Sequence, residues 1–133
     1  MLKTASETID LRVIKLENAG IFDSQVCLLI DSLMASDKPH MLVDLSLAKN
    51  NITDVGADKI SQFLDYSGNL LHVLNLHWNK VKFRGGLRLA ESLKKNDSLK
   101  VLDLSWNLIG KWELKHLGQV PVSEVKKRLN NQI

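Results

Sequence analysis

Four side chains of this sequence, Ser46, His77, Asp103 and Ser105, are of the types that carry out nucleophilic hydrolysis. In that chemistry an imidazole takes the proton of a serine hydroxyl while a carboxylate orients the imidazole. His77 and Asp103 fall in segments that we expect to lie within two strands of each other, but no recognised nucleophile motif surrounds either serine. A polar sheet face gathers such residue types by composition alone, so we predict no catalytic residues and no enzymatic activity.

Metal and cofactor sites are not indicated either. The histidines have no metal-ligand spacing to a cysteine or to one another, and they are His40, His72, His77 and His116. The tripeptide Arg84-Gly85-Gly86 lacks the spacing and the lysine of a phosphate-binding loop. Cys27 lies on the apolar stripe of a predicted helix, so we expect its thiol to be buried and unreactive.

Tryptophan is the residue type with the strongest potential for binding. Trp78 and Trp106 occupy the same position in two successive copies of an internal repeat, and His77 directly precedes Trp78. Because exposed tryptophan is enriched at binding hot spots, we predict that this column anchors a partner. Neighbouring polar residues would orient that partner, which makes the predicted protein-binding set Trp78, Trp106, His77, Asn75, Asp103, Lys49 and Ser46. The alternative is that the two indoles only stack on each other and cover a turn.

An internal repeat positions these residues. The windows Leu42–Ile52, Leu71–Val81 and Leu99–Ile109 follow one template, L-x-x-L-x-L-x-x-N-x-[LIV]. A fourth window, Leu11–Ile21, fits at every apolar position but carries Ala19 in place of the asparagine. The first positions of successive windows are 31, 29 and 28 residues apart, which leaves room for a full helix after each strand.

The L-x-L core of each window predicts a short strand, because its apolar residues alternate with period two and point to one side. In successive repeats these pairs are Ile14/Leu16, Leu45/Leu47, Leu74/Leu76 and Leu102/Leu104. We expect the strands to stack in parallel. The asparagine follows where the chain turns, and its side chain can bond backbone groups of neighbouring turns. The sequence therefore predicts a structural ladder of Asn50, Asn79 and Asn107.

Between windows the apolar spacing changes to about 3.6 residues, which is typical of an amphipathic helix. The first such segment, over 23–36, would be capped by Asp23 and Ser24, and Thr53 would cap a second helix whose apolar stripe begins at Val55. The third helix is expected over 83–93, followed by two lysines that suit the negative end of a helix dipole. Small residues at Gly56 and Gly85 would let each helix approach the sheet closely.

These four copies resemble the ribonuclease-inhibitor type of leucine-rich repeat over most of the chain, from about Leu11 to Leu117. The resemblance implies an α/β fold, a right-handed leucine-rich-repeat solenoid or horseshoe segment built of β-strand/α-helix repeats. A parallel sheet would line the concave side, helices would cover the convex side, and a short helix would cap the C-terminal end. Such repeats commonly bind proteins through concave-face aromatic, acidic and amide side chains, in agreement with the predicted tryptophan column.

The two ends of the chain depart from the template. The predicted organisation is an N-terminal cap segment over 1–10, repeats over 11–117 and a C-terminal cap over 118–133. The last repeat carries a short helix over 111–117, in which Trp112 would pack into the core. Val120–Val122 is expected to form an edge strand that Pro121 protects from further pairing, followed by a closing helix over 123–130.

Composition restricts the setting of this chain of 133 residues and 15.0 kDa. Its single cysteine cannot form an internal disulfide, and no charged-then-apolar secretory run opens the sequence. No stretch approaches the roughly 20 apolar residues of a membrane span. We therefore expect an intracellular, cytoplasmic protein without membrane contact. The net charge of +3 is too small to indicate nucleic acid, and the basic residues of the third helix would form a solvated convex face.

The favoured interpretation is a non-enzymatic protein–protein interaction module that binds a protein partner through its concave strand face. It would act as a transient adaptor or as a subunit of a larger assembly, without a cofactor. Two alternatives come from related repeats. One is a regulator of a small GTPase, similar to the Ran GTPase-activating proteins, although this chain is far shorter than their arrays. The other is a tropomodulin-like actin-binding module, which the basic segment over 123–133 resembles loosely.

Overall fold

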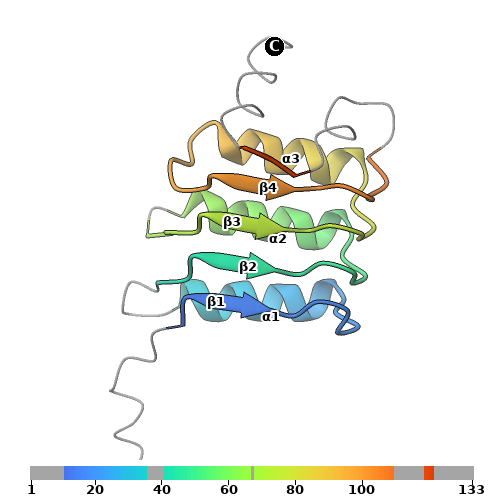
Figure 1. Ribbon diagram of the computed structural model, residues 1–133, viewed down its shortest axis with the longest axis horizontal. Coiled ribbons are helices and arrows are strands. Elements are labelled where there is room, and N and C mark those ends of the chain that lie inside the picture. The colour runs from blue at the N-terminus through green and yellow to red at the C-terminus, as the bar shows by residue number, and fades with distance from the viewer. Residues whose placement is uncertain (1–10, 36–40, 67, 110–118, 122–133) are drawn as a thin grey trace, which may run out of the picture.

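The computed structural model describes residues 11–35, 41–66, 68–109 and 119–121. Strands and helices alternate along the chain (Figure 1), in the order β1 (Val13–Lys15), α1 (Asp23–Met34), β2 (Asp44–Ser46), α2 (Asp54–Asp65), β3 (Val73–Asn75), α3 (Phe83–Leu93), β4 (Val101–Asp103) and β5 (Gln119–Pro121). The first three copies of the sequence template each contribute a strand and a helix, and the fourth contributes β4. The predicted α/β solenoid is confirmed.

The strands form one sheet in chain order, β1-β2-β3-β4-β5. The first four are parallel, and their register aligns one apolar residue from each strand in a row: Ile14, Leu45, Leu74 and Leu102. β5 pairs antiparallel with β4 and places Pro121 opposite Val101. The predicted edge strand is therefore confirmed, one residue earlier than expected. Figure 1 shows α1, α2 and α3 on one face of the sheet, and we call the opposite face the strand face.

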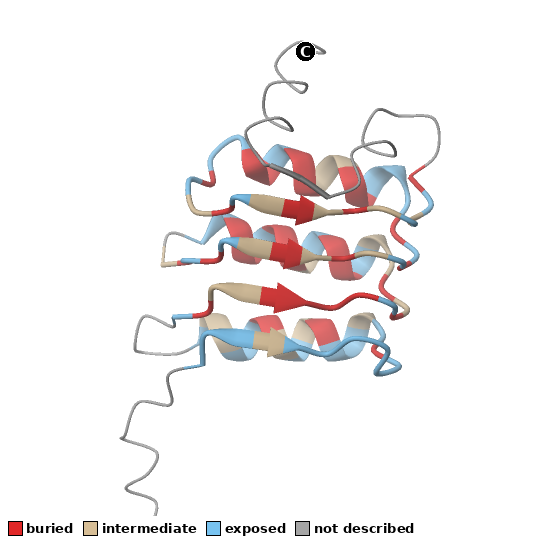
Figure 2. Ribbon diagram, in the orientation of Figure 1, coloured by how far each residue is buried: buried red, intermediate tan, exposed pale blue. Residues whose placement is uncertain are grey.

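The core lies between the sheet and the helices (Figure 2). The L-x-L leucines of the three later repeats are buried in it, as the template predicts: Leu45, Leu47, Leu74, Leu76, Leu102 and Leu104. In the first repeat Ile14 is only partly buried and Leu16 is 38% exposed. β1 is the outermost strand of the described sheet, so its side chains pack against a neighbouring strand on one side only. The first repeat therefore presents apolar side chains to solvent.

The second helix begins as the sequence indicates. Thr53 is the N-cap of α2, and its Oγ1 accepts a hydrogen bond from the Val55 N–H at 3.3 Å. The prediction that Val55 opens the buried stripe is wrong, because this residue is 63% exposed. The buried apolar positions of α2 begin two residues later, at Ala57, where the helix turns its side chains towards the sheet.

The cap of the first helix differs from the prediction. The N-cap of α1 is Phe22, so the expected cap at Asp23 and Ser24 is wrong. Asp23 Oδ1 instead accepts hydrogen bonds from backbone N–H groups of the next repeat, those of Thr53 at 2.8 Å and Gly56 at 3.0 Å. A carboxylate is favourable at a helix N-terminus, and here it caps the helix that follows its own.

Glycines near the start of α2 and α3 leave room for the capping carboxylate of the preceding repeat. A Cβ atom on Gly56 would lie 2.6 Å from both Asp23 Oδ1 and Ile52 Cγ2. A Cβ atom on Gly85 would lie 2.5 Å from Asp54 Oδ1, which belongs to the preceding helix in the same way. Small residues are therefore required at both positions. The space that they leave is occupied in part by the aspartate side chain of the preceding repeat, and not by the sheet alone.

Ion pairs join neighbouring helices. Lys59 Nζ lies 2.6 Å from Asp31 Oδ1 and links α2 to α1. Arg88 of α3 contacts two carboxylates of α2, Asp58 at 3.1 Å and Asp65 at 2.9 Å. The hydrogen bond to Asp65 raises the pKa of Arg88, and the hydrogen bond to Asp31 raises the pKa of Lys59. Because these pairs are partly exposed, each contributes little to stability.

Some predicted features lie outside the described residues: the cap segment over 1–10, the helix over 111–117 with Trp112, and the closing helix over 123–130. The division of the chain at these boundaries stays a prediction. In the part of the chain that is described, no helix is both long enough and apolar enough to cross a membrane.

Candidate protein-binding site

Buried asparagine side chains hold together the turns that follow the strands. Asn79 is 4% exposed, and its Oδ1 accepts a hydrogen bond from the Ile52 N–H of the preceding repeat at 3.0 Å. Its Nδ2 donates to the carbonyl oxygens of Leu47 at 2.9 Å and Leu76 at 3.2 Å. The side chain therefore joins its own turn to the turn before it.

Asn50 and Asn107 repeat this arrangement on either side. Asn50 Oδ1 accepts hydrogen bonds from the N–H groups of Ala19 at 3.1 Å and Ile21 at 2.9 Å. Asn107 Oδ1 accepts from the Val81 N–H at 3.0 Å. Because these bonds satisfy backbone groups inside the turns, the carboxyl ends of the strands form a rigid edge.

The residue at position eight of the template has a left-handed backbone in all four repeats. Its φ angle is 53° at Asn18, 58° at Lys49, 55° at Trp78 and 59° at Trp106. A positive φ brings Cβ close to the following carbonyl and costs about 1–2 kcal/mol for most residues, while asparagine tolerates it best among the non-glycine residues. The fold imposes this conformation at every repeat, but it does not require a tryptophan there.

Trp78 and Trp106 form an exposed aromatic pair at this edge. Their ring centroids lie 5.4 Å apart at an interplanar angle of 37°, and the residues are 54% and 71% exposed. Lys49 Nζ lies 5.8 Å from the centroid of the Trp78 ring. The His77 ring meets both indoles edge-to-face, at 6.3 and 6.4 Å between centroids. The structure thus brings four of the residues singled out in the sequence into one cluster.

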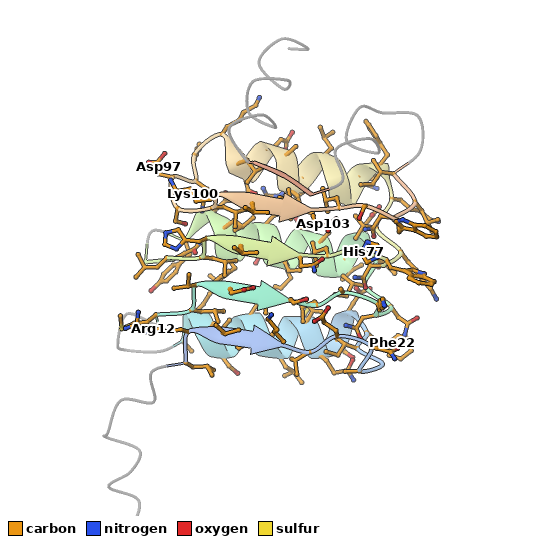
Figure 3. All side chains as sticks on the ribbon, in the orientation of Figure 1. Arg12, Phe22, His77, Asp97, Lys100 and Asp103 are labelled. Atoms are coloured by element: carbon orange, nitrogen blue, oxygen red, sulfur yellow. The ribbon has the colours of Figure 1, made fainter. Side chains whose placement is uncertain are left out.

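Hydrogen bonds order the polar residues beside the aromatic pair. His77 Nδ1 lies 2.7 Å from Ser105 Oγ, and the Ser105 hydroxyl donates to Asp103 Oδ1 at 2.6 Å. Asn75 Oδ1 accepts the His77 N–H, and Asp103 Oδ1 accepts the Ser105 N–H, both at 2.9 Å. Figure 3 shows His77 and Asp103 in adjacent repeats, towards the ends of β3 and β4. The turn and the side chains that it presents are therefore ordered together.

This set of contacts differs from a catalytic triad. In a triad the imidazole takes the serine proton and the carboxylate orients the imidazole. Here Ser105 lies between His77 and Asp103, and its hydroxyl proton is directed to the carboxylate. The direction of the hydrogen bond between His77 Nδ1 and Ser105 Oγ depends on the imidazole tautomer. This series of hydrogen bonds orders the side chains at the surface.

The prediction that Ser46 is exposed for binding is wrong. Ser46 is 3% exposed, because its short side chain belongs to β2 and lies between two flanking strands. Its Oγ has no hydrogen-bond partner in the described part of the protein. It lies in a hollow of the strand face whose lining also includes Glu17, Asp44, Asn75 and Asp103. Two of the predicted binding residues, Asn75 and Asp103, therefore line this hollow.

An open groove of about 820 Å³ runs along the carboxyl ends of the strands, across all four repeats. Its lining comes from template positions eight, nine and ten: Asn18, Gly20, Lys49, Asn50, Asn51, Trp78, Asn79, Lys80, Trp106, Asn107 and Leu108. Position eight was identified from the sequence, whereas position ten, which includes Asn51, Lys80 and Leu108, was missed. The template carried a signal for it, because position ten lies between the asparagine at position nine and the apolar residue at position eleven, which both point inward.

The described residues offer no site for a metal ion. Within 11–35, 41–66, 68–109 and 119–121, no group of three or more His, Cys, Asp or Glu is placed to hold one. Cys27 is partly buried, so the expectation of a buried thiol is only partly met.

Comparisons with known proteins agree with the repeat pattern. The leucine rich repeat family model matches residues 38–61 and 95–111. Ribonuclease inhibitor from Sus scrofa is 39% identical over 79 residues, which make up 59% of this chain and 17% of that protein. The chain therefore spans only a small part of the length of this relative.

Proposed function

Because this chain is a leucine-rich-repeat protein of the ribonuclease-inhibitor-like type, we propose that it is a non-enzymatic module that binds a protein partner. The contact surface is the strand face together with the groove at the carboxyl ends of its strands. Trp78 and Trp106 are the anchors. Polar groups of the same surface orient the partner: His77, Asn75, Asp103 and Lys49.

The exposed indole pair is the observation that carries this proposal. Both tryptophans occupy backbone positions with positive φ, and both are more than half exposed, at 54% and 71%. Strained backbone positions persist where the surrounding structure or a function requires them. The fold accounts for the positive φ at this template position. The two indoles are not buried, so core packing does not account for the presence of tryptophan there. Two large apolar side chains that solvent reaches are typical of a binding hot spot.

Mutual stacking of the two rings is the competing explanation. An aromatic pair contributes about 0.5–1.5 kcal/mol beyond the area that it buries. The left-handed backbone occurs at this position in all four repeats, including Asn18 and Lys49, so its cost is not specific to tryptophan. Stacking covers only part of each indole, because Trp78 stays 54% and Trp106 71% exposed, and this apolar surface is left for a partner.

The surface is held in its binding conformation before a partner arrives. The asparagine ladder fixes the turns, and the hydrogen bonds of His77, Ser105 and Asp103 fix the adjoining side chains. Rigid aromatic anchors on such a base lose little conformational entropy on binding. This favours recognition by a preformed surface over folding on binding.

The same proposal places the protein in the cytoplasm, as an adaptor or as a subunit of a larger assembly. The lone thiol of Cys27 is consistent with a reducing compartment. Regulation of a small GTPase and tropomodulin-like actin binding are kept as alternatives, because no contact among the described residues favours either of them. Identification of the partner would decide between these possibilities.

Affinity purification followed by mass spectrometry tests the proposal, with a Trp78→Asn/Trp106→Asn double variant beside the wild type. Asparagine is chosen because Asn18 occupies the same template position with the same sign of φ. We expect recovery of the partner to fall by about tenfold or more. The free energy of unfolding should change by less than about 1 kcal/mol, since lost stacking and relieved backbone strain offset each other.

Leu28→Asn is the matched control. Leu28 is 69% exposed on α1 and does not line the groove, so its substitution removes an equally exposed apolar side chain elsewhere. This variant should recover the partner as the wild type does. Wild-type recovery by the double tryptophan variant would show that the indole pair is not the binding surface.

A further inference from the structure

Building on the proposed function, we infer that the groove accepts a short extended segment of the partner in which carboxylates flank an apolar side chain. Two lysines, Lys49 and Lys80, line the groove together with the exposed apolar surface of Trp78, Trp106 and Leu108. Among the described residues that line it, none is an aspartate or a glutamate. The groove therefore combines positive charge with exposed apolar surface.

The positive charge of the groove is not neutralised within the described chain. The Lys49 ammonium lies over the Trp78 ring, and Lys80 contacts no carboxylate among the described residues. The ion pairs of the described part engage other cations, Lys59 and Arg88 on the helices. Carboxylates of a bound segment would supply the missing partners through charge-assisted hydrogen bonds.

The adjoining strand face has the opposite charge. Its hollow is lined by the carboxylates of Glu17, Asp44 and Asp103, with Lys15 as the cation among its described lining residues. An acidic segment is therefore repelled from the strand face and attracted to the groove. Neighbouring surfaces of opposite sign fix the register of a partner, so the segment runs across the repeats along the groove.

The length of the segment follows from the spacing of the repeats. Neighbouring strands lie about 4.8 Å apart, so the three steps from the first repeat to the fourth span about 14 Å. An extended chain rises about 3.3 Å per residue, which corresponds to about four or five residues in contact. The side-chain amides of Asn18 and Asn51 line the same groove and offer both donors and acceptors to an extended backbone.

A single-stranded nucleic acid fits the groove less well than an extended peptide does. Such ligands stack successive bases on separate aromatic faces. Here the two indoles lie 5.4 Å apart and turn partly towards each other, which leaves no room for a base between them. Lys49 lies over Trp78, so the outer face of Trp106 is the one open platform of the pair. One platform and two lysines favour a peptide over a nucleic acid.

Fluorescence anisotropy with synthetic probes tests the inference. Three fluorescein-labelled decapeptides share the same leucine and phenylalanine positions, and their other positions are all glutamate, all glutamine or all lysine. A labelled oligo-uridine is the fourth probe. At about 50 mM NaCl we expect the glutamate peptide to bind about tenfold more tightly than the glutamine peptide, and the difference should shrink at about 300 mM NaCl.

Lysine substitutions assign the effect to the groove. Lys49→Gln/Lys80→Gln should remove the preference for the glutamate peptide. Lys94→Gln/Lys95→Gln changes the net charge equally but alters exposed residues that do not line the groove, so this variant should keep the preference. Loss of the preference in both variants would indicate a general charge effect and would overturn the inference.

The remaining outcomes separate this inference from the proposed function. Equal or tighter binding of the glutamine or lysine peptide overturns the acidic preference, and if that binding is lost in Trp78→Asn/Trp106→Asn the proposed binding surface still holds. Binding of the oligo-uridine alone, or of no probe, also overturns the inference. Peptide binding that the double tryptophan variant leaves unchanged would contradict both proposals.

Discussion

Substitution of one ladder asparagine tests how the solenoid is held together. In Asn79→Ala the Ile52 N–H loses its acceptor at 3.0 Å and becomes an unsatisfied buried donor. The Leu47 and Leu76 carbonyl oxygens each lose one bond, but Asn50 Nδ2 still donates to the first at 2.9 Å and Asn107 Nδ2 to the second at 2.8 Å. The remaining bond of Asn79 Nδ2, to the His77 carbonyl oxygen at 3.5 Å, is too long to contribute much. The substitution therefore leaves one group without any partner and weakens two others.

The magnitude follows from this inventory. An unsatisfied buried donor costs about 1–3 kcal/mol, and each hydrogen bond lost from a group that keeps another partner costs about 0.5–1 kcal/mol. We expect Asn79→Ala to lower the free energy of unfolding by about 2–5 kcal/mol. For a domain of this size the melting temperature should then fall by roughly 10 °C.

Urea unfolding followed by circular dichroism measures the change, with Asn51→Ala as the control. Asn51 follows a ladder asparagine, is half-buried, and contributes its backbone N–H rather than its side chain to the contact with Ile21. This control should lose less than about 0.5 kcal/mol, as is usual for a surface substitution. Equal destabilisation by Asn79→Ala and Asn51→Ala would refute the assignment of the buried amide as the element that joins the repeats.

Two further substitutions test the packing of the repeats. Leu74→Ala should lower the free energy of unfolding by about 2–5 kcal/mol because Leu74 is fully buried. Val73→Ala, on the strand face, should lower it by less than about 1.5 kcal/mol. Urea titration compares the two variants, and similar losses would contradict the assignment of Leu74 to the core and Val73 to the strand face. Asp23→Ala should lower the free energy of unfolding by about 1–2 kcal/mol, because it removes the acceptor for the Thr53 and Gly56 N–H groups, whereas Ser24→Ala should be nearly neutral. Hydrogen exchange at the start of α2 should accelerate in Asp23→Ala alone. Unchanged exchange there would argue against capping of α2 by the preceding repeat.

Much of the fold was predictable because each repeat meets the same local requirements at the same sequence offsets. The alternation of Leu74 and Leu76 predicts a strand with one buried side, and the later 3.6-residue spacing predicts a helix. The asparagine at position nine, such as Asn79, occurs where a turn leaves backbone groups without partners. The position-eight column of Trp78 and Trp106 follows from the same template, because equal offsets in stacked repeats place side chains next to each other.

The sequence by itself therefore determined the repeat architecture, the buried leucines and the column that carries the two tryptophans. Only the tertiary structure decided that Ser46 is covered, that Asp23 caps the helix of the next repeat, and that Ser105 lies between His77 and Asp103. The physical reason is that these outcomes depend on which atoms face each other across neighbouring repeats about 28–31 positions apart in the chain. A template describes what each position shares among repeats, whereas burial, hydrogen bonding and charge at a surface depend on how the individual side chains meet.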